Sequence, residues 1–150
     1  MAKKTVLKNA VKKKSAAKKS RAKPAAKKLV ESANFGAVFE GLKKVMAAFA
    51  PQLQVTVDEP KKYYLVTRSK SWRGGPMYFG AVILGKAYVS YHLMPLYTHP
   101  QLTKTMSPEL KKRKQGKSCF NFRALDEKLS AELAELTQAG LDAYRSKNWL

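Results

Sequence analysis

The stretch that decides the fold is MYFGAVILGKAYVSYHLM, at residues 77–94. Its first part, MYFGAVIL at 77–84, is an unbroken apolar run, which is typical of a central strand covered on both faces. Its last part, AYVSYHLM at 87–94, is rich in β-branched and aromatic residues, and Gly85-Lys86 suits a two-residue hairpin turn. The stretch therefore predicts two antiparallel strands at the centre of a sheet.

The segments on either side of this hairpin predict further strands. QVTVD at 54–58 alternates apolar and polar residues, and YYLVTR at 63–68 follows after a turn at Pro60. SCFNFR at 118–123 has the same character, so the sequence predicts about five strands. Short turns between neighbouring strands favour an antiparallel sheet.

Two long amphipathic helices are predicted at the two ends of this strand region. The first covers roughly 35–50, with Ser32 or Asn34 as its cap and Pro51 as its stop. The second begins at the cap Asp126 and ends near residue 146. The apolar positions of the two helices are Phe35, Phe39, Leu42, Val45 or Met46, and Phe49 in the first, and Leu129, Leu133, Leu136, Gly140 and Tyr144 in the second.

A short helix is also predicted between the hairpin and the last strand. Ser107-Pro108-Glu109 is a helix start, with a capping serine, a proline at the first position and an acid in the first turn. LKKRK at 110–114 forms its body, and Gly116 is expected to end it. Together these elements predict an α+β fold, with N- and C-terminal amphipathic helices covering one side of the sheet.

Charge divides the chain into two parts. The net charge is +20, and residues 1–28 hold twelve basic residues and no acidic one. With little apolar surface to bury, this lysine-rich segment is predicted to be a disordered tail. Leu29 and Val30 mark the change of composition, so the domain is predicted to span 29–150.

The basic residues predict contact with a polyanion. Lysine side chains are flexible point charges suited to phosphate contacts that read no sequence, and the tail lacks an apolar membrane anchor. DNA or RNA is therefore the expected partner, in the cytoplasm and with the nucleoid as one expected location. A second basic group lies at 111–117, where the alternative is a solvated helix end. The predicted polyanion-binding residues are Lys3, Lys4, Lys8, Lys12, Lys13, Lys14, Lys18, Lys19, Arg21, Lys23, Lys27, Lys28, Lys111, Lys112, Arg113, Lys114 and Lys117.

No motif identifies a reaction. Gly116-Lys117-Ser118 resembles the end of a phosphate loop, but the glycine required five positions earlier is Lys111. Cys119 with His92 or His99 as its base would be a nucleophile, although a cysteine in a short apolar strand is more often a packed side chain. His99, before a proline, is expected in a turn. No spacing predicts a metal, and no cofactor is expected.

The strand at 87–94 has two different faces. Tyr88, Ser90 and His92 alternate with Val89, Tyr91 and Leu93. The more polar face is the one with His92. In a sheet covered on one side, that face meets solvent, a ligand or a second subunit. A homodimer through the open face is therefore one expected arrangement.

The region from Asn34 to about Trp149 resembles the YdhG-like family of small intracellular domains. MYFGAV at 77–82, YVSYHLMPLY at 88–97, LKKRKQGKSCFNF at 110–122 and the last helix carry the resemblance. It implies a compact α+β domain with an antiparallel sheet. Some relatives are described as frataxin-like iron chaperones, but the basic first helix departs from an iron-holding acidic surface. Candidate ligand positions in these motifs are Tyr91, His92, Met94, Pro95, Gly116, Lys117 and Ser118.

Two functions follow as expectations. The first is a non-enzymatic binding or accessory domain whose lysine-rich tail contacts nucleic acid without sequence preference. The alternative is a small-ligand or iron-chaperone-like protein with an incidental solubilising tail.

Overall fold

The computed structural model describes residues 34–70 and 73–150. The predicted tail at 1–28, the composition change at Leu29 and Val30, and the cap Ser32 lie outside these residues. The helical elements are α2 (Phe35–Ala47), η1 (Ala50–Gln52), α3 (Pro95–Thr98), η2 (Pro100–Thr105), α4 (Pro108–Arg113) and α5 (Glu127–Ser146). The strands are β1 (Gln54–Glu59), β2 (Lys62–Lys70), β3 (Pro76–Leu84), β4 (Val89–Leu93), β5 (Lys114–Gln115) and β6 (Cys119–Phe122).

The strands form one antiparallel sheet in the order β1-β2-β3-β4-β6-β5, so the α+β prediction is confirmed. The sheet has six strands where the sequence predicted about five. The additional strand is β5, whose Lys114 pairs with Phe120. Two polar residues carry no apolar alternation, so sequence patterning did not reveal this strand.

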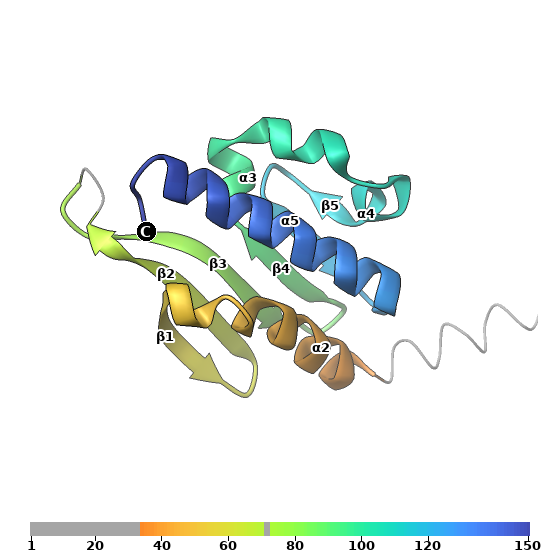
Figure 1. The fold of residues 1–150 in the computed structure, drawn as a ribbon. Coiled ribbons are helices and arrows are strands. Elements are labelled where there is room, and N and C mark those ends of the chain that lie inside the picture. Colours follow the sequence, from red (N-terminus) through yellow and green to blue (C-terminus); the bar gives the residue numbers. More distant parts are fainter. Residues whose placement is uncertain (1–33, 71–72) are drawn as a thin grey trace, which may run out of the picture.

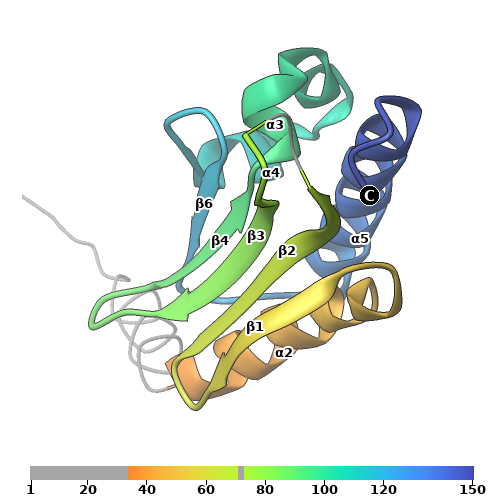
Figure 2. The same ribbon diagram turned by 90° about the vertical axis from the view of Figure 1, so that its left-hand side faces the viewer.

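Both long helices lie side by side on the same face of the sheet (Figures 1 and 2). The core between them and the strands includes Phe39, Leu42 and Met46 from α2, and Leu133 and Leu141 from α5. The predicted one-sided covering is therefore confirmed. At the middle of β3, the consecutive residues Phe79 to Val82 are all buried, as the unbroken apolar run predicted, although α2 and α5 lie on one face of the sheet.

The central hairpin is confirmed, with its turn one residue later than predicted. Leu84 pairs with Val89, and the Gly85 N–H donates to the Tyr88 carbonyl at 2.9 Å. Lys86 and Ala87 therefore form the tip, rather than Gly85-Lys86.

This register turns Val89, Tyr91 and Leu93 into the core, as the alternation predicted. Ser90 and His92 lie on the open face and are partly exposed.

Helix α2 ends earlier than its apolar repeat. Phe49 is buried, but the helix stops at Ala47, and Pro51 lies inside the 3-10 helix η1 instead of terminating α2. Proline is tolerated in a first helical turn because its missing N–H has no partner to lose there. Asn34 occupies the cap position without a side-chain cap hydrogen bond; its carbonyl accepts from the Val38 N–H at 3.0 Å.

Helix α5 has the predicted cap and a point of close approach. The Leu129 N–H donates to Asp126 Oδ1 at 2.7 Å. Farther along, Gly140 crosses the start of α3, where a Cβ on Gly140 would lie 2.8 Å from the Pro95 Cβ. Tyr144 then packs edge-on against Phe79, with ring centroids 5.6 Å apart.

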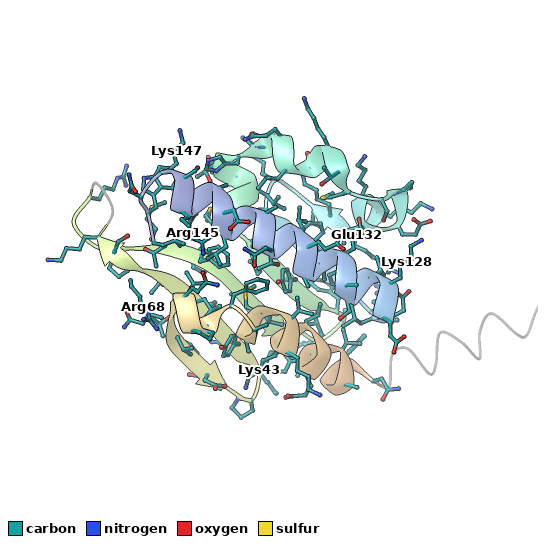
Figure 3. The ribbon with its side chains drawn as sticks, viewed as in Figure 1. Lys43, Arg68, Lys128, Glu132, Arg145 and Lys147 are labelled. Carbon is teal, nitrogen blue, oxygen red and sulfur yellow. The ribbon has the colours of Figure 1, made fainter. Side chains whose placement is uncertain are left out.

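The start of α4 is joined to α5 by a side chain that sequence analysis did not single out. Ser107 caps α4 as predicted, since the Leu110 N–H donates to Ser107 Oγ at 3.2 Å. The Ser107 N–H and hydroxyl also donate to the Glu132 carboxylate at 2.6 and 2.7 Å. Glu132 lies on α5 (Figure 3), so this carboxylate fixes the position of the basic segment that follows.

Within the described ranges, no helix combines the length and the apolar character needed to cross a membrane.

Candidate functional site

The pairing of β4 with β6 brings most of the sequence motifs to one end of the sheet. His92 lies opposite Cys119, and the Leu93 N–H donates to the Ser118 carbonyl at 2.8 Å. Because these strands are antiparallel, the segment that follows β4 and the turn that precedes β6 meet at the same end. That end contains α3 and the turn at 116–118.

A cationic surface adjoins this end, and we call it the basic corner. It begins in the last turn of α4, continues through β5 and ends in the following turn. Three of its side chains are exposed and two are half-buried. Its members are Lys111, Lys112, Arg113, Lys114 and Lys117.

The structure corrects the predicted role of Gly116. Helix α4 ends at Arg113, and Lys114 already has extended backbone angles. Gly116 lies in the turn between β5 and β6 with φ of +68°, a left-handed conformation that favours glycine. It therefore forms the hairpin turn and does not end the helix. The Lys114 ammonium donates to the Gly116 carbonyl at 2.5 Å, which holds this cation against the turn.

An exposed aromatic ring stands beside the basic corner. Tyr97 of α3 is 56% exposed, and the Lys117 Nζ lies 5.1 Å from its ring centroid. Both residues line a cleft of about 200 Å³, which we call the Tyr97 cleft. Tyr97 was not among the predicted site residues, although it lies two positions after Pro95 in the motif YVSYHLMPLY. The Tyr97 cleft is lined by Leu96, Tyr97, Pro100, Thr103, Lys114 and Lys117.

Two of the predicted motif positions are core residues. Tyr91 is fully buried, and its hydroxyl lies 2.7 Å from Thr137 Oγ1. Burial raises the pKa of Tyr91 well above its usual value. Pro95 is buried against Gly140. These two side chains support the fold and are not available to a ligand.

Met94 precedes α3 and does not line the Tyr97 cleft. Its N–H donates to the Phe79 carbonyl at 2.9 Å. Its side chain helps to line a shallow hollow of about 450 Å³ with Met77 and Tyr78. Met94 is therefore partly accessible, but it does not join the cationic cluster.

His92 and Cys119 form a pair on the open face of the sheet. The Cys119 Sγ lies 2.9 Å from the His92 Nδ1, and both side chains are partly exposed. Cys119 is only partly buried, whereas the sequence favoured a small buried side chain: Phe120 and Phe122 point into the core, so Cys119 lies on the other face of the sheet. Burial lowers the pKa of His92, which favours the neutral imidazole.

His99 is separate from this pair. It lies between α3 and η2, as the turn prediction expected, and its ring packs near Trp149 with centroids 6.0 Å apart. Its Nδ1 is 2.9 Å from the Thr98 hydroxyl. Of the two bases proposed for Cys119, the structure pairs His92 with the thiol.

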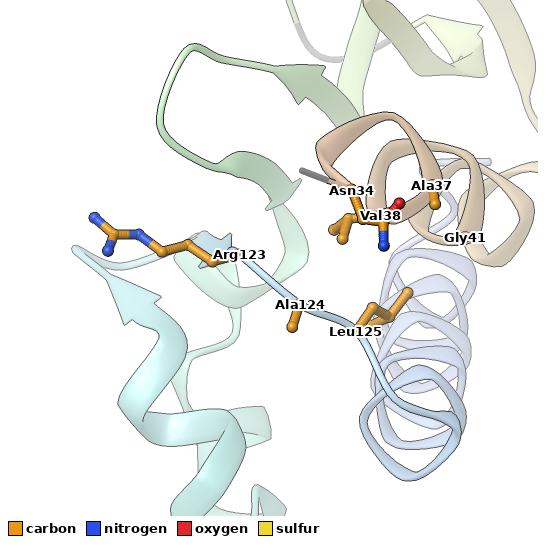
Figure 4. Close-up of a pocket in the computed structure, with 7 residues that line it drawn as sticks. All are labelled: Asn34, Ala37, Val38, Gly41, Arg123, Ala124 and Leu125. Atoms are coloured by element: carbon orange, nitrogen blue, oxygen red, sulfur yellow. The ribbon is translucent and has the colours of Figure 1, made fainter. Parts of the chain in front are cut away.

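A separate hollow of about 310 Å³ opens between the start of α2 and the segment joining β6 to α5 (Figure 4). Its wall is mainly apolar, and Asn34 contributes an amide. Figure 4 shows the Arg123 side chain extending away from α2. The lining residues are Asn34, Ala37, Val38, Gly41, Arg123, Ala124 and Leu125.

Metal ligands do not gather in the described part of the chain, where no three His, Cys, Asp or Glu residues come together. Comparisons with known proteins add no relative: no family model matches the sequence, and searches of curated proteins and of solved structures give no significant match.

Proposed function

We propose that this protein is a non-enzymatic accessory protein that binds nucleic acid through its phosphate backbone. The observation that supports the proposal is the basic corner, which projects five cations from consecutive elements at one end of the sheet. The lysine-rich segment 1–28 adds twelve further cations to the same chain. Lysine and arginine side chains that are not placed in a groove of the nucleic acid by a recognition element bind phosphates rather than base edges.

The charges of the basic corner have no carboxylate partner within the described ranges. The ion pairs found there join Lys43 to Asp58 and Arg145 to Asp142, both at 2.5 Å. Lys114 and Lys117 instead contact a carbonyl and an aromatic ring, and neither contact neutralises charge. A phosphate can therefore approach these side chains without first breaking a salt bridge.

The proposal predicts a specific change in salt dependence. Each neutralised phosphate on duplex DNA contributes about −0.9 to the slope of log K against log salt. Replacing the exposed Lys111, Lys112 and Lys117 by Gln in the full chain should make the slope shallower by roughly 3. Fluorescence anisotropy with a labelled duplex at several salt concentrations measures the slope for the wild-type and variant proteins.

A matched control removes the same charge elsewhere. Lys61, Lys62 and Lys86 are exposed and lie in or beside turns toward the opposite end of β3 and β4, since Lys62, the first residue of β2, pairs with Ile83. The triple Gln variant at these positions should change the slope by less than about 1. Equal changes in the two triple variants would show that only total charge matters and would refute a site at the basic corner.

A small-ligand function is a second proposal, favoured by the hollow beside Asn34. Its volume of about 310 Å³ is at the lower end of the range of about 300–1,000 Å³ for small-molecule sites. A saturable thermal shift in a panel of small apolar ligands, lost in Ala37→Trp, is the expected result. No shift, or one that survives this substitution, would reject the hollow as the site.

The iron-chaperone function, membership of the YdhG-like family, a homodimer through the open sheet face and a cytoplasmic or nucleoid location stay predictions from the sequence. Iron loading has no supporting ligand cluster in the residues that the structure describes.

A further inference from the structure

The Tyr97 cleft combines two chemistries that the proposed function does not by itself require. Tyr97 presents the most exposed large apolar side chain of the described residues, at 56%, against 41% for Val55 and 39% for Tyr88. An exposed ring beside cations can offer one ligand both a stacking surface and charged partners. A patch that only attracts phosphate needs no aromatic surface.

The ring is held in place by its short helix. Pro95 packs on Gly140, and Leu96 is buried, so the two residues that precede the exposed Tyr97 anchor α3. The Tyr97 N–H also donates to the Met94 carbonyl at 2.8 Å. The backbone that carries the ring is therefore held before any ligand arrives, which lowers the ordering cost of binding.

Two lysines line the cleft beside the ring. The Lys117 Nζ lies 5.1 Å from the Tyr97 centroid, and Lys114 is tied to the neighbouring turn. Leu96 and Pro100 supply apolar wall. At about 200 Å³, the cleft is smaller than a site that encloses a drug-sized ligand and suits one planar group.

We propose that the Tyr97 cleft takes one unpaired base of single-stranded nucleic acid, stacked on Tyr97, with the adjoining phosphates on Lys114 and Lys117. This inference rests on the proposed function and adds a preference for single strands. In a duplex each base is stacked between its neighbours and does not offer a free face to the ring. Stacking on an aromatic side chain accepts any base, so no sequence preference is expected.

The contact between Lys117 and Tyr97 does not block this arrangement. Lys117 is exposed and has a flexible stem, so its ammonium can leave the ring for a phosphate while the base takes its place. The lysine then exchanges a weak exposed cation–π contact for a charged partner.

The test compares a short labelled single strand with a duplex of the same length, using the full chain at two salt concentrations. Tyr97→Leu should weaken binding of the single strand by roughly fivefold or more and leave duplex binding within about twofold. Tyr97→Trp, which keeps the ring, should retain the preference. Tyr88→Leu removes another exposed tyrosine, outside the cleft, and should change neither affinity.

The outcomes separate this inference from the proposed function. If Tyr97→Leu leaves single-strand binding unchanged, or weakens both ligands equally, base stacking is refuted even when the Lys111, Lys112 and Lys117 triple variant still flattens the duplex salt slope. If wild-type protein binds neither ligand, both proposals fail. Thermal melting of each variant confirms that the fold is retained, and Tyr97→Trp supplies the informative comparison if Tyr97→Leu is unstable.

Discussion

The buried pair Tyr91 and Thr137 is the clearest polar contact at the scale of single residues. The Thr137 hydroxyl has one proton, and it donates to the Leu133 carbonyl at 2.6 Å. The Tyr91 hydroxyl must therefore be the donor in its 2.7 Å contact with Thr137 Oγ1. Thr137→Val removes that acceptor inside the core, and we expect a loss of about 1–3 kcal/mol in the free energy of unfolding.

The control for this prediction is a substitution of Tyr91, the hydrogen-bond donor of the pair. Tyr91→Phe removes a donor but leaves Thr137 bonded to Leu133, so its expected cost is smaller, about 0.5–1.5 kcal/mol. In Tyr91→Phe/Thr137→Val no polar group is left unpaired, and the double variant should be more stable than the sum of single costs implies. Urea unfolding of the four proteins measures the coupling, and additive costs would contradict the assignment of donor and acceptor.

His92 gives the pH dependence expected at this scale. Burial lowers its pKa in the folded state, so the unfolded chain binds the proton more tightly. Stability should therefore be full above the ordinary histidine pKa of about 6.5 and should fall as the pH drops toward the lowered folded value. His92→Gln should flatten this part of the stability–pH curve. An unchanged curve in the variant would assign the dependence to another group.

The pairing of His92 with Cys119 shows what sequence can and cannot predict for single residues. Alternation correctly placed His92 on the more polar face of its strand. It did not choose between His92 and His99 as the partner of Cys119, because that choice depends on which strand lies beside β4. The register of β4 with β6 is a long-range property, and no local pattern near Cys119 specifies it.

At the scale of elements, the crossing of α5 over α3 depends on a missing side chain. Alanine normally stabilises a helix relative to glycine by roughly 0.5–1 kcal/mol. At Gly140, however, an added Cβ would lie 2.8 Å from the Pro95 Cβ, closer than packed carbons allow. Gly140→Ala should therefore destabilise the protein despite its better helix propensity, with a lower melting temperature as the readout.

Gly36 in α2 is the matched control for that prediction. A Cβ there would meet nothing within 4 Å, so Gly36→Ala should leave the melting temperature unchanged or raise it. A stabilising effect at both glycines would mean that α5 and α3 are not in close contact.

The long elements were predictable because their patterns are repetitive. The apolar steps of α2 and α5 and the alternation in β2 and β4 each extend over several residues, so small local exceptions do not hide them. The sequence-based predictions were wrong for short elements and for the ends of elements. Strand β5 has two polar residues, Gly116 served a hairpin instead of a helix end, and Phe49 continued an apolar repeat beyond its helix.

At the scale of the whole molecule, charge is distributed in two separate groups. Residues 1–28 hold twelve of the thirty basic residues, and the basic corner holds five more on the folded domain. Composition alone revealed both groups. It did not reveal that the second group adjoins an exposed aromatic ring, because α3 and the turn at 116–118 are brought together only by the pairing of β4 and β6.

If both groups contact one nucleic acid, they should act as linked binding sites. Binding by one group raises the effective concentration of the other, so their effects on affinity should be coupled. A chain that begins at Leu29 should retard duplex DNA far less than the full chain at low salt. Replacing Lys111, Lys112 and Lys117 by Gln should then cost more affinity in the full chain than in the shortened one, because only the full chain can engage both groups.

Gel retardation and anisotropy of the four proteins, the full and shortened chains each with and without the Gln triple substitution, measure this coupling. Equal retardation by the full and shortened chains would remove the N-terminal segment from the binding surface, and equal costs of the Gln triple variant in both backgrounds would show that the two groups act independently.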